Sequence, residues 1–162
     1  MEPVQLQSTH ASAVASLWLS GVRENARAER AYLPAVSQEE YAATIVARLA
    51  NGSIFGWVIV LPSPPRLVAY LMAELKESAP EFVQRKYLNL LDLDVRQAER
   101  RNGYGTSLVE AAKRYSKKAD LSSIEVNWVT ADVQASAFWQ RQGFSPYLSR
   151  ARLSAAVFAS DA

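Results

Sequence analysis

Hydrophobic and polar residues alternate along this chain with two different periods, which predict strands and helices in turn. Residues 4–7 alternate as a short strand does, and Ser8 or Thr9 then offers a hydroxyl that can cap a helix. A second helix is predicted to begin at a capping box formed by Ser37 and Glu40 and to stop at residues 51–52. The first helix has apolar residues at the spacing i, i+3, i+4 and i+7, namely Val14, Leu17, Trp18 and Gly21.

The middle of the chain predicts three strands. Residues 54–61 and 67–75 form a hairpin with a proline-rich turn, and residues 87–95 give the strongest strand pattern. Side chains alternate along a strand, which places Leu91, Leu93 and Val95 on one face of this strand and Leu90, Asp92 and Asp94 on the other. Two carboxylates on one face of a central strand are unusual, so Asp92 and Asp94 mark this strand as a candidate functional element.

The remaining third of the chain predicts two more helices with a strand between them. A helix follows Gly105 and runs to Asp120, a strand covers 124–129, and a short helix over 133–142 is closed by Gly143. Residues 144–158 are expected to supply one or two final strands. No repeat or linker interrupts the pattern, so we expect one α/β domain over residues 1–162.

Composition excludes several kinds of site. A chain of 162 residues with 49% hydrophobic residues has enough apolar material for one core. Because it has no cysteine and only one histidine, His10, it is not expected to hold a metal, a disulfide or a Cys/His nucleophile pair. The N-terminus lacks the pattern of a signal peptide, and the longest apolar stretch, 54–61, is too short to span a membrane. A cytoplasmic location is the default expectation.

Charge is balanced overall but uneven along the chain. The formal net charge of +2 argues against a protein whose main partner is nucleic acid. Residues 96–118, however, carry a local excess of +5.

The basic turn in this stretch has the features of an anion site. A strand ends at Val95, a basic turn with two glycines follows, and a helix then opens, so several unpaired N–H groups and a positive helix end meet at one point. A single Gly-x-Gly before a helix is more often only a tight turn, and basic residues on a helix usually form a solvated face. The spacing fits neither the dinucleotide fingerprint nor the P-loop.

The motifs around this turn resemble those of the GNAT superfamily of acetyl-CoA-dependent N-acetyltransferases. The family signature is Arg/Gln-x-x-Gly-x-Gly/Ala after a strand that ends in Leu-x-Val. This chain has Leu93-Asp94-Val95 followed by Arg100-Arg101-Asn102-Gly103-Tyr104-Gly105. A second family element, Asn-x-x-Ala with a tyrosine and Gly-Phe after it, is approximated by Asp132-Val133-Gln134-Ala135, Trp139 and Gly143-Phe144.

The resemblance implies a mixed, mostly antiparallel sheet with a splayed parallel pair of strands and about four flanking helices. Acetyl-CoA would lie across the pair formed by 87–95 and 124–129. Backbone N–H groups from Arg101 to Thr106 would bind its pyrophosphate, Leu93 and Val95 would pair with the pantetheine arm, and an N–H near Val95 would polarise the thioester carbonyl. The implied cofactor residues are Leu93, Val95, Arg100, Arg101, Asn102, Gly103, Tyr104, Gly105, Thr106, Asp132 and Trp139.

Two departures from the family pattern bear on the chemistry. Trp139 stands where the family has a tyrosine that protonates the leaving thiolate, and an indole cannot do so. We expect Trp139 beside the thioester, with Phe138 turned toward the sheet; the alternative is that Trp139 is only a core residue. Tyr104 or Tyr147 could supply the proton instead. Asp132 replaces the usual asparagine, and its simplest role is to cap the following helix.

A base must accept a proton from the incoming amine. Asp92 and Glu74 lie on the two central strands and are the candidates, although each could be only a hydrogen-bonded carboxylate. Asn89 stands where some family members have a glutamate base, which disfavours that protein-lysine acetylating subtype. Glu24, Glu29 and Tyr32 lie in a polar stretch that could recognise a cationic acceptor, but exposed residues of this kind are more often only solvated.

These observations predict an N-acetyltransferase that moves an acetyl group from acetyl-CoA to the amine of a small molecule or a peptide by direct attack. No nucleic-acid or membrane partner is expected, and edge strands near the C-terminus could support a homodimer. The alternative is a catalytically impaired acyl-CoA-binding sensor or structural module, which the two departures would favour.

Overall fold

A five-stranded mixed sheet forms the centre of the molecule, and the computed structural model describes residues 1–28 and 33–151 of the chain. The strands lie in the order of the sequence. They are β1 (Val4–Gln5), β2 (Phe55–Pro62), β3 (Pro65–Glu77), β4 (Lys86–Val95) and β5 (Ser123–Val126). Neighbours from β1 to β4 are antiparallel and β4 is parallel to β5. The predicted mixed sheet with one parallel pair is confirmed.

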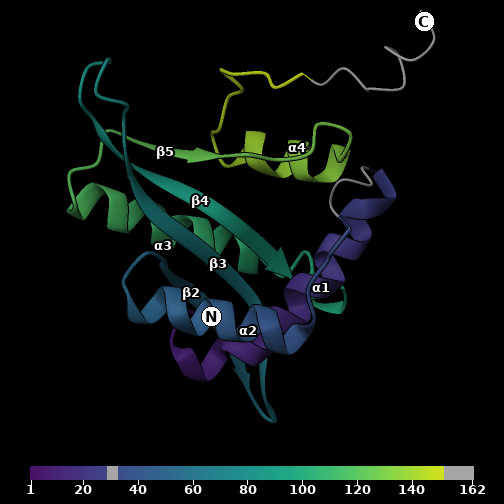
Figure 1. Ribbon diagram of the computed structural model, residues 1–162. Helices are drawn as coiled ribbons and strands as arrows, with labels where there is room; N and C mark the ends of the chain where they lie inside the picture. The colour runs from purple at the N-terminus through teal and green to yellow at the C-terminus, as the bar shows by residue number, and fades with distance from the viewer. Residues whose placement is uncertain (29–32, 152–162) are drawn as a thin grey trace, which may run out of the picture.

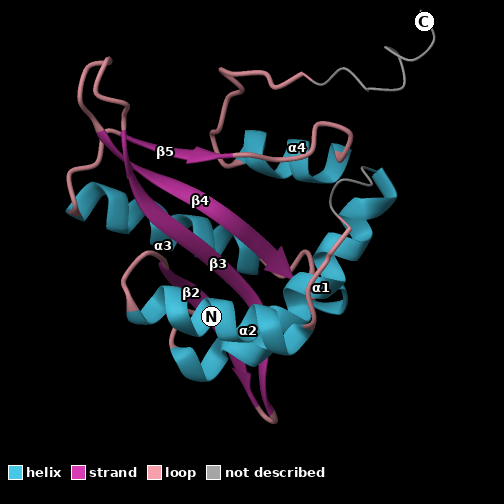
Figure 2. Ribbon diagram, in the orientation of Figure 1, coloured by secondary structure: helices cyan, strands magenta, loops and turns pink. Residues whose placement is uncertain are grey.

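Helices cover both faces of the sheet (Figures 1 and 2). Helices α1 (Ala11–Ala28) and α2 (Gln38–Ala50) pack on one face, and α3 (Tyr104–Lys118) and α4 (Val133–Arg141) pack on the other. We call these the α1/α2 face and the α3/α4 face. In Figure 1, α1 crosses the carboxyl end of β4. None of the described helices has the length and apolar character needed to cross a membrane.

Helix starts follow the local sequence closely. Ser37 and Glu40 form the predicted capping box, in which Glu40 N–H donates to the Ser37 hydroxyl (3.2 Å) and Ser37 N–H donates to the Glu40 carboxylate (2.7 Å). The expected cap at Ser8 or Thr9 is wrong, because both residues lie in a 3-10 turn, Ser8–His10, that leads into α1. A second 3-10 turn, Gln97–Glu99, follows β4.

A β-bulge in β4 changes which side chains share a face. Met72 of β3 pairs with Asp92, but the next residue, Ala73, pairs with Leu90, so Leu91 is an extra residue in β4. Leu91 is 37% exposed. The predicted grouping of Leu90 with Asp92 and Asp94 is wrong for this reason. The residues of β4 that join the α3/α4 core lie on both sides of the bulge: Leu88, Leu90, Leu93 and Val95.

The end of the chain departs further from the predicted strands. β5 stops at Val126 rather than at 129, although Ile124, Val126 and Trp128 do share the α3/α4 side as predicted. Residues 144–151 contain no strand, so that part of the expected C-terminal strands is wrong. Residues 152–158 lie outside the described part of the chain.

Candidate active site

The edge of β4 that faces β5 is paired only along its first half. Pairing runs from Tyr87 with Ser123 to Leu90 with Val126, and β5 then ends. Beyond the bulge, β4 continues to Val95 with β3 as its strand neighbour, and no described strand lies along its other edge. Because alternate N–H groups of a strand point to opposite edges, this segment offers backbone donors and acceptors to an extended ligand.

The turn after β4 brings a second set of donors to the end of this edge. Gly103 is the residue before α3 and has φ +79°, and Arg101 has φ +69°. Within the described residues no side chain caps this helix, whereas Ser37 caps α2 and Asp132 caps α4. The first N–H groups of α3 are therefore available to an anion, which the positive end of the helix also favours.

The two glycines of the turn serve different purposes. A Cβ at Gly103 would meet no atom within 4 Å, so its left-handed backbone is what requires glycine. A Cβ at Gly105 would lie 3.2 Å from the Phe138 ring and 3.7 Å from Val95 Cγ2. Gly105 thus allows α3 to pack closely against α4 and β4.

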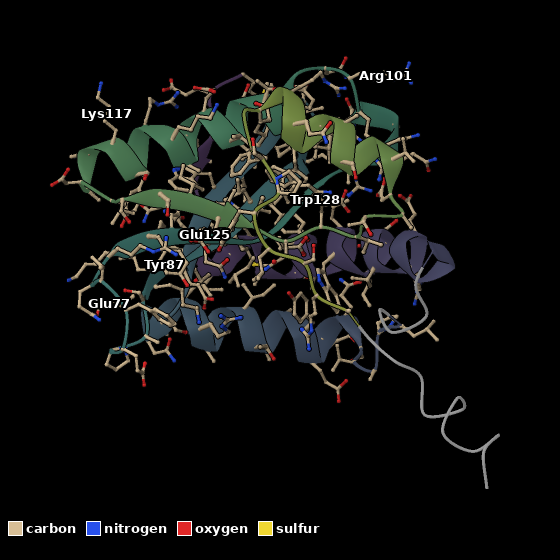
Figure 3. The ribbon with its side chains drawn as sticks, turned by 90° about the horizontal axis from the view of Figure 1, so that it is seen from above. Glu77, Tyr87, Arg101, Lys117, Glu125 and Trp128 are labelled. Carbon is tan, nitrogen blue, oxygen red and sulfur yellow. The ribbon has the colours of Figure 1, made fainter. Side chains whose placement is uncertain are left out.

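The basic residues near the turn divide into paired and exposed groups. The Arg100 guanidinium donates to Glu24 of α1 (2.7 Å) and, through Nε, to the Val95 carbonyl (3.1 Å). Lys113 is paired with Glu110 (2.8 Å). Arg101 is exposed at the start of α3, at the other end of that helix from Lys117 (Figure 3).

Two half-buried carboxylates lie on the opposite face of the same strand segment. The Tyr70 hydroxyl of β3 donates to Asp92 Oδ2 (2.6 Å). Burial raises the pKa of Asp92 from its ordinary 3.8 to about 6, although the bonds from Tyr70 and from the Leu93 amide lower it. Burial and the neighbouring Asp92 charge raise the pKa of Asp94 from 3.8 to about 7, against the lowering effect of Arg100.

Asp94 is held between β4 and α1. Its Oδ1 accepts the N–H of Val95 (2.7 Å) and lies 3.6 Å from Arg100 Nη2. Helix α1 passes over it at Gly21, where an added Cβ would overlap Asp94 Oδ2. Sequence reasoning placed Gly21 on the apolar face of the first helix but did not identify its partner, which comes from a distant strand.

Glu74 lies one row further along the α1/α2 face. Its carboxylate accepts a hydrogen bond from Asn89 (3.0 Å), its strand neighbour, and forms ion pairs with Arg48 (3.4 Å) and Lys76 (3.1 Å). The side chain at position 89 is therefore an amide that holds the Glu74 carboxylate in place, and not a carboxylate that could act as a base.

Helix α4 differs in part from the prediction. Asp132 caps it as expected, accepting the N–H of Ala135 (2.9 Å). Trp139 is only 6% exposed and packs edge-to-face against Phe138 and Phe144, while Phe138 is half-buried. Phe138 packs against the core beside Gly105, in keeping with its predicted orientation toward the sheet. The expectation that Trp139 turns away from the core is wrong, and the alternative of a core tryptophan is correct.

One further carboxylate, that of Glu125, was not singled out from sequence. Glu125 of β5 accepts bonds from Arg85 (2.7 Å) and from the Tyr147 hydroxyl (2.8 Å), and Figure 3 shows Glu125 near Tyr87. Glu24 lines a cavity of about 680 Å³ between α1 and residues 36–38. Glu29 and Tyr32 lie outside the described residues.

Comparison with known proteins agrees with this geometry. A sequence model described as the acetyltransferase (GNAT) family matches residues 12–144. The chain belongs to the GNAT acetyltransferase family. No curated protein sequence matches it significantly.

Solved structures show the same fold for this GNAT chain at low sequence identity. A tetramutant of the BH1408 protein from Bacillus halodurans superimposes with a TM-score of 0.86 at 19% identity, covering 95% of this chain and 99% of that one. A GCN5-related N-acetyltransferase from Ralstonia eutropha gives 0.72 at 23% identity, with 95% and 98% covered. An aminoglycoside 6′-N-acetyltransferase from Acinetobacter haemolyticus gives 0.70 at 17%, with 95% and 97% covered.

Proposed function

We propose that this protein transfers an acetyl group from acetyl-CoA to a primary amine of a small molecule or a peptide by direct attack in a ternary complex. The observation that carries the proposal is the arrangement around residues 91–95. The unpaired edge of this segment leads to the uncapped start of α3, and its α1/α2 face carries Asp92 and Asp94. Donors for a polyanionic thioester and acceptors for an amine proton thus lie on one strand.

The chain offers a suitable place for each part of acetyl-CoA, which would supply the acetyl group as a thioester. Backbone N–H groups from Arg101 to Thr106 would hold the pyrophosphate, and exposed Arg101 would add positive charge. The backbone of Leu93 and Val95 would pair with the extended arm. A backbone N–H near Val95 would stabilise charge on the carbonyl oxygen, an interaction typically worth about 3–4 kcal/mol in the transition state.

Asp92 is our first candidate for the base. At pH 7 an amine that resembles lysine is mostly protonated, so a carboxylate must remove that proton directly or through water. A pKa of about 6 leaves Asp92 mostly ionised at pH 7 while it remains a better base than an ordinary aspartate. Glu74 is the second candidate, although Arg48, Lys76 and Asn89 already contact its carboxylate.

Protonation of the leaving thiolate does not require Trp139. A thiol such as that of CoA titrates near 8.5, so its release as the anion at pH 7 costs only about 2 kcal/mol. The thiolate would take its proton from water or from a tyrosine. Tyr104, the first residue of α3, and Tyr147, whose hydroxyl donates to Glu125, are the two candidates.

The burial of Trp139 favours one alternative function, an acyl-CoA-binding module with impaired catalysis. Thiol release separates the two possibilities. Binding of acetyl-CoA measured by calorimetry, followed by release of free CoA thiol with a panel of amines, supports the enzyme. Binding without thiol release supports the module, and no binding at concentrations well above micromolar refutes both.

A variant of the turn tests whether acetyl-CoA binds there, and a second glycine variant is its control. Gly103→Trp places a large side chain where the phosphates would lie and forces it into a left-handed backbone, so it should abolish acetyl-CoA binding. Gly52→Trp is the control, because Gly52 has φ +72°, open space around its Cβ position and a location far from the turn. Equal loss of binding in both variants would indicate unfolding.

A further inference from the structure

The carboxylate of Asp94 occupies a backbone donor at the free edge of β4. Arg96 N–H donates to Val68 on β3 (2.8 Å), so alternation along the strand points Val95 N–H away from β3 and toward the unpaired edge. That N–H is bonded to Asp94 Oδ1 (2.7 Å), and the Val95 carbonyl is bonded to Arg100 Nε (3.1 Å). Both edge groups of Val95 are thus held by side chains of the same chain.

We propose that Asp94 is a positioning residue that competes with the arm of acetyl-CoA for the Val95 N–H. This inference rests on the proposed function. In the closed arrangement Asp94 holds the donor, and in the open arrangement the carboxylate has moved away and the donor is free. The apparent affinity for acetyl-CoA is then reduced by the fraction of protein in the open arrangement.

Residues beside Asp94 determine how easily its carboxylate moves away from the Val95 N–H. Arg100 Nη2 is 3.6 Å from Asp94 Oδ1, so this guanidinium can bind the carboxylate after it has moved. Glu24 competes for the same guanidinium at 2.7 Å, which links the exchange to α1. Gly21 leaves the room that the closed arrangement needs, because a Cβ there would overlap Asp94 Oδ2.

The competition also makes binding sensitive to pH, because a neutral carboxyl holds the N–H more weakly than a carboxylate does. The charged and titratable groups that face Asp94 are Asp92 of β4, Tyr70 of β3, Glu24 of α1 and Arg100 of the following loop. Burial, followed by the charges of Asp92 and Glu24, raises the pKa of Asp94 to about 7 against the lowering effects of Arg100 and the Val95 N–H, so its charge changes between pH 6 and pH 8.

The test compares two probes that share phosphates but differ in the arm. Acetyl-CoA carries both, and adenosine 3′,5′-bisphosphate carries phosphates alone. Calorimetry of the full chain at pH 6 and pH 8 should show acetyl-CoA losing about three- to tenfold more affinity than the bisphosphate as the pH rises. The 5′-phosphate is a monoester with a second pKa of about 6 only in the bisphosphate. The same two probes measured with Asp94→Ala therefore show how much of the pH difference comes from the phosphates themselves.

Three variants complete the test. Asp94→Ala should tighten acetyl-CoA binding about three- to tenfold at pH 8, leave the bisphosphate within twofold, and reduce the difference in pH dependence by about three- to tenfold. Asp94→Asn, which keeps an acceptor but no charge, should fall between. Gly21→Ala keeps every charge but displaces the carboxylate, so it should also tighten acetyl-CoA selectively, and it serves if Asp94→Ala does not fold.

Each outcome decides the inference. Equal tightening of both probes would mean a general electrostatic effect and would overturn it, as would a pH difference between the probes that is as large in Asp94→Ala as in wild type. Wild-type protein that binds acetyl-CoA but shows neither effect refutes the role of Asp94 alone. Failure of wild type and variants to bind acetyl-CoA at all refutes the proposed function as well.

Discussion

Asp92 lowers the stability of the fold above neutral pH, and replacing it by asparagine should recover that stability. Burial raises its pKa from 3.8 to about 6, so the folded protein keeps a proton that the unfolded chain releases. The contribution to stability is fully present below pH 3.8 and is lost as the pH rises to about 6. Since one pKa unit corresponds to about 1.4 kcal/mol, the loss is about 3 kcal/mol in the free energy of unfolding.

Asp92→Asn removes the ionisation but keeps the shape and an acceptor for the Tyr70 hydroxyl. We expect the variant to gain up to about 3 kcal/mol over wild type at pH 8 and little at pH 4. For a chain of this length each kcal/mol moves Tm by roughly 2–4 °C. Loss of the Asp92 charge also lowers the pKa of Asp94, which acts in the same direction.

Urea denaturation of both proteins at pH 4 and pH 8 measures the effect. Glu74→Gln is the matched control, because Glu74 lies on the same face but is ion-paired, so its replacement should not stabilise the protein at pH 8. A variant no more stable than wild type at pH 8, or equally stabilised at both pH values, would refute the reasoning. If Asp92 is also the base, the stabilised variant should lose acetyl transfer.

Substitutions at three further residues have defined outcomes. Tyr70→Phe removes a hydrogen bond that lowers the pKa of Asp92, so the acidic limb of the kcat/KM profile should move up by about 1–2 pH units, and an unmoved limb would exclude Asp92 as the base. Asp132→Ala should cost about 1 kcal/mol in thermal denaturation while Asp132→Asn costs little, because both aspartate and asparagine cap helices well. Gly56→Ala should destabilise by about 1–3 kcal/mol or more, since its Cβ would overlap the backbone oxygen of Leu71, and a Tm equal to that of wild type would contradict the pairing of β2 with β3.

Sequence reasoning succeeded where neighbouring residues determine the structure. The capping box at Ser37 and Glu40 and the cap at Asp132 involve side chains three residues from the N–H groups they bind, so their chemistry can be read directly. The Arg100 to Gly105 motif likewise predicts the turn before α3.

Partners that are distant along the chain could not be predicted in this way. Asp92 was a candidate from the start, but its bond to Tyr70 depends on the register of β3 and β4. The contact of Gly21 with Asp94 depends on where α1 crosses the sheet. The orientation predicted for Trp139 was wrong because its neighbour Phe138 alone could supply the apolar face of a nine-residue helix, whereas in the structure both rings pack against the α3/α4 core.

The bulge at Leu91 links the two halves of the proposed site. Its signal is present in the sequence, since apolar residues at 88 and 90 are followed by apolar residues at 93 and 95. In the structure Leu88 and Leu90 are buried, and Leu93 and Val95 are partly buried against the same core. Strict alternation from Leu88 and Leu90 would turn Asp92 and Asp94 toward α3, into an apolar core and beside the turn proposed to bind phosphates. The extra residue places both carboxylates on the α1/α2 face instead, and pairing with β5 ends at the same point. One inserted residue therefore separates the groups suited to an amine from the groups suited to phosphates, and frees the strand edge between them.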